Sequence, residues 1–370
     1  MKIERVEMRL VSMVLKESFT TSFGTVERKE FIVITAHAGG IRGYGEVAAL
    51  PAPLYSYETT GTSWVILEQF LVPAVLDREW SHPAELPRFW KHLRGHGMAK
   101  CGLEQAAWCA WAEAQGVSLA RALGGTHERV EVGVSIGIQL TPARLLQLIE
   151  DYLGQGYRRI KVKIKPGWDV GVVREVRRRF GDIPLMVDAN SAYTLADAAH
   201  LQRLDEFGLM MIEQPLEEDD LVDHATLQRS LRTPVCLDES ITSPAAGRRA
   251  LDLGSCRTIN IKVGRVGGPT AARELHDLAR AAGAPVWCGG MLESGIGRAH
   301  NLALASLPGF TLPGDISASD RYWHRDLIVP PVAMATDGTI PIPDGPGLGF
   351  AVDEEYLETL TLKKVAMKGG

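Results

Sequence analysis

The chain has 370 residues, 45% of them hydrophobic, and carries a formal net charge of −5 at pH 7. This length buries a large core and favours two domains, or one barrel with an added piece. The small negative charge and the lack of any long Lys or Arg run give no electrostatic reason to expect a nucleic acid or an anionic membrane as partner. A small-molecule substrate is therefore the expected partner.

The five cysteines are odd in number and form no Cys-x-x-Cys motif, which favours neither a disulfide framework nor a zinc site. A reducing cytoplasm is the location expected from this usage. The amino-terminal segment MKIERVEMRLVSMVL interrupts its apolar residues with charges, which predicts a strand and not a signal peptide. No apolar run approaches about 18 residues, so no transmembrane span is expected.

Residues 1 to about 50 predict a meander of strands. Lys2 to Leu15 alternates, Glu30 to His37 holds an apolar run, and Gly39-Gly40 makes a turn before a third strand. The polar and aromatic segment between the first two strands, Ser18 to Gly24, is more typical of a loop than of a strand interior. A plain connection is the simpler interpretation, and a lid over a site is the alternative.

From Tyr57 to Leu123 the apolar spacing becomes helical, with a long apolar-faced helix predicted over Met98 to Ala114. Trp108 and Trp111 in this helix are expected in the core. Gly-Gly at positions 124 and 125 ends the helical block, so a domain boundary is expected near residue 125.

After this boundary, short strands and helices alternate strictly, which indicates a parallel sheet. The segment HERVEVGVSIGI predicts the first strand, and seven more follow at 159–164, 185–187, 209–212, 234–237, 258–261, 285–288 and 311–313. Helices are predicted between them at 142–154, 170–180, 194–207, 219–231, 244–253, 269–282 and 297–306. Eight strands in this order match a TIM-type barrel.

One conspicuous charge closes each of five consecutive predicted strands. Starting at Lys163, the steps to Asp188, Glu213, Asp238 and Lys262 are 25, 25, 25 and 24 residues, about one strand, one helix and two loops. Because the carboxyl ends of successive parallel strands meet at one rim of a barrel, we expect these side chains to share one mouth. Barrel enzymes place their chemistry at this mouth.

The three carboxylates, Asp188, Glu213 and Asp238, predict a metal site. They offer only oxygen ligands on stiff strand ends, which suits a hard divalent cation, with Mg²⁺ expected and Mn²⁺ as the alternative. No His lies beside them in the sequence, which argues against zinc or non-haem iron. A lone Asp at a strand end is usually a cap or an ion-pair partner, and the equal spacing of three favours the metal site.

Lys161 and Lys163 alternate with apolar neighbours, so both point to the same side of their strand. If that side is the barrel interior, their charges need the nearby carboxylates, a metal ion and an anionic substrate as partners. A solvated edge with paired lysines is the alternative. Near a dication the pKa of a lysine falls, because the positive neighbour disfavours the ammonium form, and the lysine becomes a usable base.

Lys163 and Lys262, on the second and sixth predicted strands, would face a substrate carbon from opposite sides of the mouth. A proton next to a carboxylate is very weakly acidic, and a cation on that carboxylate stabilises the enediolate formed when the proton leaves. One base then gives elimination or epimerisation at a single face, whereas two bases give racemisation.

These residues resemble the enolase superfamily, and within it the muconate-lactonizing-enzyme subgroup, marked by Lys-x-Lys on the second strand and Lys on the sixth. Within the subgroup, the chain is similar to the family of o-succinylbenzoate synthases and N-succinylamino acid (N-acylamino acid) racemases. The segments that carry the resemblance are KVKIKPGWD, PLMVDANSAYTLADA, MMIEQPL, LDESI, NIKVGRVGG, VWCGGMLESGIGRAHNLALASLP and LPGDIS.

The resemblance implies an α/β fold, a modified TIM barrel of the type (β/α)7β with an α+β capping domain. Residues 1–125 would form the capping domain and residues 126–320 the catalytic barrel, while the tail at 321–370 would pack on the capping domain. A homo-oligomer is expected, although the sequence does not specify its size. The implied activity is the menaquinone-pathway dehydration, a racemisation, or both.

The resemblance also assigns roles to the charged residues. The three carboxylates would bind Mg²⁺, and Lys161 would help to neutralise the substrate carboxylate. In the dehydration of the cyclohexadiene precursor, Lys163 would remove the proton and Lys262 would stabilise the enolate as a cation. In racemisation, these two lysines would exchange donor and acceptor roles. Further substrate contacts are expected from Ser135, Asn190, Gly289, Met291 and Glu293.

Alternative functions stay open at this point. Muconate cycloisomerisation shares the same lysines and metal ligands. Dipeptide epimerases carry Asp-x-Asp on the eighth strand, and the sequence here, Asp315-Ile316-Ser317, disfavours dipeptides. A non-catalytic alternative is a metal-dependent carboxylate-binding protein on an inert barrel. The segments Ser18 to Gly24 and Pro51 to Tyr57 resemble the specificity loops of the family.

Overall fold

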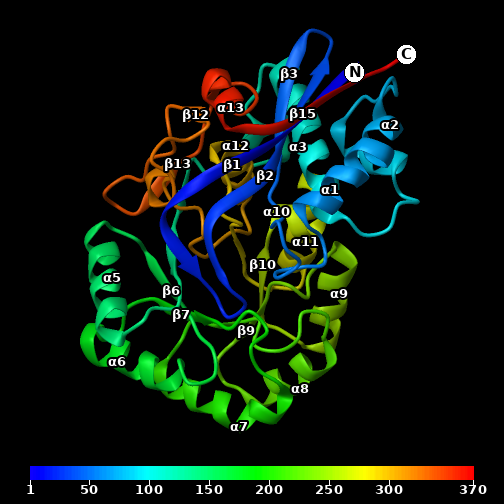
Figure 1. The fold of residues 1–370 in the computed structure, drawn as a ribbon. Coiled ribbons are helices and arrows are strands. Elements are labelled where there is room, and N and C mark those ends of the chain that lie inside the picture. The colour runs from blue at the N-terminus through cyan, green and yellow to red at the C-terminus, as the bar shows by residue number, and fades with distance from the viewer.

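The computed structural model describes all 370 residues. A four-stranded antiparallel sheet and its helices lie against one end of a barrel, and both termini lie at the end of the molecule away from that barrel (Figure 1). The sheet has the order β15-β1-β2-β3. Its strands are β1 (Arg5–Thr20), β2 (Thr25–Ala38), β3 (Ile41–Val47) and β15 (Thr361–Lys368).

The β1–β2 hairpin is longer than the sequence predicted. Strand β1 continues to Thr20 and β2 begins at Thr25, so only the tip of the predicted loop is a turn. The reason is that Phe19 and Thr20 pair with Val26 and Thr25 across the hairpin after a register shift. The tip reaches the barrel, where the carbonyl of Thr20 accepts a hydrogen bond from the Ile138 N–H at 2.9 Å.

Six helical segments follow β3, and among them α3 packs directly on β2 and β3. They are α1 (Thr60–Ile66), η1 (Leu67–Leu71), α2 (Val72–Val75), η2 (Pro83–Phe89), α3 (Gly97–Ala114) and α4 (Leu119–Leu123). Helix α3 lies so close to β3 that only glycine fits at Gly43. A Cβ added there would stand 2.0 Å from the Ala106 carbonyl oxygen. Trp108 of α3 is fully buried as predicted, whereas Trp111 is only partly buried and donates to the Ser81 carbonyl at 3.1 Å.

The barrel contains a seven-stranded parallel sheet in sequential order. Its strands are β5 (Gly133–Ile136), β6 (Arg159–Lys163), β7 (Leu185–Asp188), β8 (Ile212–Glu213), β9 (Val235–Leu237), β10 (Thr258–Ile261) and β11 (Val286–Cys288). The outer helices are α5 (Pro142–Gly154), α6 (Val170–Phe180), α7 (Ala198–Leu201) flanked by η3 (Leu195–Asp197) and η4 (Gln202–Phe207), α8 (Val222–Ser230), α9 (Pro244–Leu253), α10 (Val263–Val266), α11 (Pro269–Ala281) and α12 (Gly295–Ala305).

The eighth predicted strand is present only as two isolated bridges. Phe310 pairs with Val286 of β11, and Gly314 pairs with Val132 just before β5, so this segment joins the two edges of the sheet. Pro313 lies between the bridges and has no N–H to donate, which prevents a regular ladder. The predicted α/β barrel with its capping sheet is therefore confirmed, with an irregular closure.

The carboxyl-terminal tail contacts both parts of the molecule. Strand β15 pairs with β1, while β13 (Thr339–Pro341) pairs with β4 (Arg129–Glu131) beside the barrel. The remaining tail elements are η5 (Ser319–Arg321), β12 (Ile328–Val329), β14 (Ala351–Val352) and α13 (Glu354–Leu360). The division at residues 125 and 320 stays a prediction. None of the helices combines the length and apolarity needed to cross a membrane.

Candidate active site

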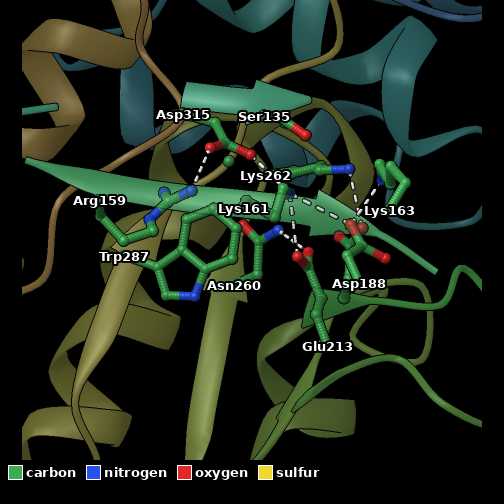
Figure 2. A network of polar contacts seen from close by, with 12 residues as sticks. Ser135, Arg159, Lys161, Lys163, Asp188, Glu213, Asn260, Lys262, Trp287 and Asp315 are labelled. Atoms are coloured by element: carbon green, nitrogen blue, oxygen red, sulfur yellow. Dashed lines mark hydrogen bonds and ion pairs between the residues drawn. The ribbon is translucent and has the colours of Figure 1, made fainter. Parts of the chain in front are cut away.

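The five evenly spaced charged residues meet at one rim of the barrel. Lys163, Asp188 and Glu213 are the last residues of β6, β7 and β8, and Asp238 and Lys262 directly follow β9 and β10. The parallel register places Lys163 opposite Asp188, and Asp188 opposite Glu213. All five side chains are buried, and Figure 2 shows Lys163, Asp188, Glu213 and Lys262 gathered together. The repeat of one βα unit therefore produces the cluster that the spacing predicted.

Lys161 and Lys163 both lie inside the barrel, and the solvated edge is not what the structure shows. The Lys163 ammonium group contacts Asp188 Oδ2 and Asn190 Oδ1, each at 2.5 Å. The Lys161 ammonium group contacts Glu213 Oε2 at 2.9 Å and Asp188 Oδ2 at 3.2 Å. Burial of these charges is balanced by direct carboxylate contacts, as buried ions require.

Lys262 belongs to a second ion cluster on the other side of the mouth. Its Nζ contacts Asp238 Oδ2 at 2.8 Å and the Tyr55 hydroxyl at 3.1 Å. The Tyr55 hydroxyl also donates to Asp238 Oδ1 at 3.0 Å, and Arg265 donates to the same carboxylate oxygen. The sequence had singled out the loop that carries Tyr55 but not the residue, and it missed Arg265.

A cavity opens between the barrel rim and the capping sheet, and most of the predicted substrate contacts line it. Ser135, Asn190, Met291 and Glu293 do so together with the three lysines. Gly289 does not line it, because its Cα faces Asn260, whose Oδ1 would stand 2.3 Å from an added Cβ. The three predicted metal ligands lie beneath the lysines and are not part of the cavity surface.

Opposite the lysines, the cavity wall comes from the capping domain. The hairpin tip contributes Phe19, Thr21 and Phe23, and the segment after β3 contributes Leu50 and Tyr55. The Ser22 hydroxyl donates to the Asn190 carbonyl at 3.1 Å, which holds the tip on the barrel. Both segments that the sequence compared with specificity loops therefore reach the cavity.

The carboxylates fit a hard divalent cation by their chemistry, because they are buried, adjacent and offer only oxygen. Glu239, which the sequence did not single out, adds another buried carboxylate, and its Oε2 has no hydrogen-bond partner. In the structure, however, the oxygens of Asp188, Glu213 and Asp238 face ammonium groups, and no three acidic, His or Cys side chains converge as a metal site. A cation would compete with the lysines for these oxygens.

The three lysines differ in basicity. Burial lowers the pKa of Lys163, although Asp188 partly opposes this effect. Burial acts in the same direction on Lys161, but attraction from Asp315, Glu213 and Asp188 outweighs it and raises the pKa. The pKa of Lys262 is also raised, since its neighbours Tyr55 and Glu239 outweigh its burial. Lys163 is therefore the lysine that most readily becomes a neutral base.

Two family models match this chain. The enolase C-terminal domain-like family matches residues 144–356, and the mandelate racemase / muconate lactonizing enzyme N-terminal domain matches residues 5–124.

Among curated relatives, an o-succinylbenzoate synthase of Geobacillus kaustophilus is 58% identical over 97% of this chain and 96% of the relative. An N-succinylamino acid racemase of Amycolatopsis sp is 49% identical over 99% of each chain. Among solved structures, an enolase superfamily member from Listeria innocua has a TM-score of 0.96 at 40% identity, covering 100% of this chain and 99% of that one.

Proposed function

The chain belongs to the enolase superfamily, and from this premise we propose that it removes a proton from the carbon next to a substrate carboxylate. Its activities are o-succinylbenzoate synthesis by dehydration, N-succinylamino acid racemisation, or both. Relatives that are 47% to 58% identical over nearly the whole chain carry these two names. Both reactions begin with the same proton abstraction, so one site serves both.

The observation that carries this proposal is the pair of lysines, Lys163 and Lys262, that line one cavity from the second and sixth barrel strands. A substrate carbon between them would meet one amine on each face. Lys161 lies beside Lys163 and would bind the substrate carboxylate. A divalent cation held by the three carboxylates, Mg²⁺ by preference, would supply charge stabilisation for that carboxylate.

In the dehydration, Lys163 takes the proton because its pKa is lowered by burial. The ammonium group formed in this way would return the proton to the leaving hydroxide, which departs as water. Lys262 stays cationic, held by Asp238, and stabilises the enolate charge from the other face. The C–H and C–O bonds break, a C=C bond forms, and no oxidant is needed.

In the racemisation, the two lysines act on opposite faces of the α-carbon. One removes the proton as a neutral amine while the other donates a proton as an ammonium ion, and the configuration inverts. Lys262 must then lose its proton in one direction of the reaction, against its raised pKa. Substrate binding between the ion clusters must therefore weaken the contacts that hold Lys262 charged.

The muconate cycloisomerase alternative uses the same residues, and high identity to the two named activities favours them over it. An inert carboxylate-binding barrel is disfavoured because both proton-transfer lysines are present. The five cysteines are free and buried, in keeping with a reducing cytoplasm. The homo-oligomeric state stays a prediction.

The test is exchange of the α-proton of an N-succinyl amino acid with D₂O in the presence of Mg²⁺, followed by ¹H NMR. We expect exchange and inversion, together with turnover of the cyclohexadiene precursor to o-succinylbenzoate. Lys163→Ala serves as the inactive control. If no acylated amino acid exchanges its α-proton and the precursor is not dehydrated, the chain is a binding protein and the proposed function is wrong.

A further inference from the structure

Strand β6 carries a third basic residue on its inward face. Arg159, Lys161 and Lys163 occupy alternate positions, and all three are buried. Arg159 is only 2% exposed, so its guanidinium group needs a fixed anion. Figure 2 shows that anion, the carboxylate of Asp315, linked to both Arg159 and Lys161. Asp315 therefore pairs with two basic residues of β6.

Asp315 uses one carboxylate oxygen for each base. Its Oδ1 accepts from Arg159 Nη1 at 2.8 Å, and its Oδ2 lies 2.6 Å from Lys161 Nζ. The backbone holds Asp315 in place, since its N–H donates to the Cys288 carbonyl at 2.9 Å. Arg159 also donates to the Pro313 carbonyl at 2.8 Å. The carboxylate is thus fixed by the closure of the barrel and by Arg159.

The indole of Trp287 supports both cations from below. The Arg159 guanidinium carbon lies 5.0 Å from the ring centre, and the Lys161 ammonium nitrogen lies 4.9 Å from it. Contacts of this length between a cation and an aromatic ring are attractive. Trp287 is fully buried, and its Nε1 donates to Cys236 Sγ at 3.3 Å, so the ring itself is held firmly.

Three carboxylates contact Lys161, and only two of them are also proposed ligands of a cation. Asp188 and Glu213 are proposed to hold a cation, which would draw on the same oxygens that now face Lys161. Asp315 has no such second role and makes the shortest of the three contacts. It is the partner that stays with Lys161 whatever Asp188 and Glu213 bind.

We propose that Asp315, locked by Arg159, is a positioning residue that holds the Lys161 ammonium group at the cavity wall to receive the substrate carboxylate. This inference rests on the proposed function of Lys161. Without Asp315, the Lys161 ammonium group keeps only its contacts with Asp188 and Glu213, and its position then depends on what these two carboxylates bind. The ammonium group is then no longer fixed where the substrate carboxylate binds. The affinity for substrate should therefore fall more than the rate of proton transfer at Lys163.

The experiment compares Asp315→Asn with the wild type in Mg²⁺, using o-succinylbenzoate as the binding probe in calorimetry and steady-state kinetics as the second readout. We expect Kd and KM to rise by about tenfold or more, as for truncated buried charge pairs, with a smaller change in kcat. Asp315→Glu, which keeps the charge, should recover part of the loss. Asp169→Asn is the matched control, because it removes another buried carboxylate without touching Lys161.

Asp315→Asn leaves Arg159 buried and unpaired, which destabilises the fold. The double variant Arg159→Gln/Asp315→Asn removes both charges and should show the same loss of affinity in a folded protein. A double-mutant cycle with Lys161→Met tests whether Asp315 acts through this lysine. If Asp315 acts through Lys161, then Asp315→Asn has no further effect on Kd when Lys161 is already replaced.

Two results would overturn the inference while leaving the proposed function intact. One is wild-type affinity for o-succinylbenzoate in both Asp315→Asn and the double variant. The other is an equal loss of affinity in the Lys161→Met background, which would give Asp315 a role independent of the lysine. A wild-type protein that neither dehydrates the precursor, nor exchanges the α-proton of N-succinyl amino acids, nor binds o-succinylbenzoate would overturn the proposed function, and the inference with it.

Discussion

The cavity has two walls, and different forces fix their side chains. The barrel wall includes Ser135, Lys161, Lys163, Asn190 and Lys262, which stand in or next to strands whose register is set by backbone hydrogen bonds. The capping wall, formed by Phe19, Thr21, Phe23, Val26, Leu50 and Tyr55, stands on a hairpin tip and the segment that follows β3. The barrel wall carries all the charged lining residues, namely the three lysines, Arg298, Glu293 and Asp315, and the capping wall is mainly apolar.

Because of this difference, proton transfer and substrate selectivity depend on different parts of the molecule. Proton transfer needs amines placed to within a fraction of an ångström, which rigid strand ends supply. Recognition of a variable acyl group or side chain tolerates loops and hairpin tips that vary in sequence. Tyr55 is the exception, because it stands on the capping wall and contacts Lys262 and Asp238 on the barrel side. Through Tyr55 the position of the capping domain bears on the proton-transfer groups.

The largest expected effect is that of Lys163→Ala on the barrel wall. Loss of the general base should lower kcat by about a thousandfold for both dehydration and racemisation. The measurement is steady-state turnover of both substrates, with circular dichroism to check the fold. More than a tenth of the wild-type rate in the variant would show that another group removes the proton.

Lys262→Ala tests the opposite face of the same wall. Racemisation of N-succinyl amino acids should fall by roughly a hundredfold or more, since the second proton donor is absent. Exchange in D₂O, catalysed by Lys163 alone, should survive for one enantiomer and disappear for the other. Wild-type racemisation by Lys262→Ala or Lys262→Arg would contradict the two-base assignment.

Asp238→Asn tests the carboxylates beneath the barrel wall. The Mg²⁺ concentration for half-maximal activity should rise by about tenfold or more, because one charged oxygen ligand is lost. Titration of EDTA-treated protein with Mg²⁺ gives this value. An unchanged metal requirement would mean that the ligand set is wrong.

Phe19→Ala tests the capping wall. Removing this ring should raise KM by about tenfold for substrates with large apolar groups and change kcat little, as is usual for apolar contacts in a pocket. Leu50→Ala on the neighbouring segment is the companion variant. An equal fall in kcat for all substrates would show that the capping wall takes part in proton transfer and would remove the distinction between the walls.

A last expected effect is on stability and not on activity, at the junction of the two domains. Burial raises the pKa of Glu104 on α3 to about 7. A raised carboxyl pKa stabilises the fold below the ordinary value and loses this contribution as pH rises through about 7. Glu104→Gln should therefore gain on the order of 3 kcal/mol relative to wild type between pH 5 and pH 8. Thermal unfolding at both pH values measures it, and a constant difference would exclude the effect.

The strand-end charges could be predicted from the sequence because a parallel barrel converts equal spacing into spatial proximity. The same alternation that oriented Lys161 and Lys163 extends to Arg159, so the signal for the third base was present and was not used. Tyr55 could not be found in this way, because it is 207 residues from Lys262 in sequence and meets it only through domain docking. Arg265 was hidden in a Gly-rich segment that follows Lys262.

Other differences have local causes. Pro313 turned a predicted eighth strand into two bridges, and a register shift in the hairpin extended β1 into what looked like a loop. Gly289 and Gly290 are adjacent and equally plausible in sequence, yet only Gly290 lines the cavity, because the backbone at Gly289 is pressed against Asn260. Close packing of this kind has no pattern in the sequence.

The pairing of β15 with β1 connects the carboxyl-terminal strand to the cavity. Strand β1 is one continuous element, held by β15 over residues 5–11 and bearing Phe19 of the cavity close to its other end. A change in the position of β1 at its β15-paired end would therefore also move the hairpin tip, to which β1 extends. We therefore expect that loss of the β15–β1 pairing changes substrate selectivity at the other end of the strand, where Phe19 lines the cavity.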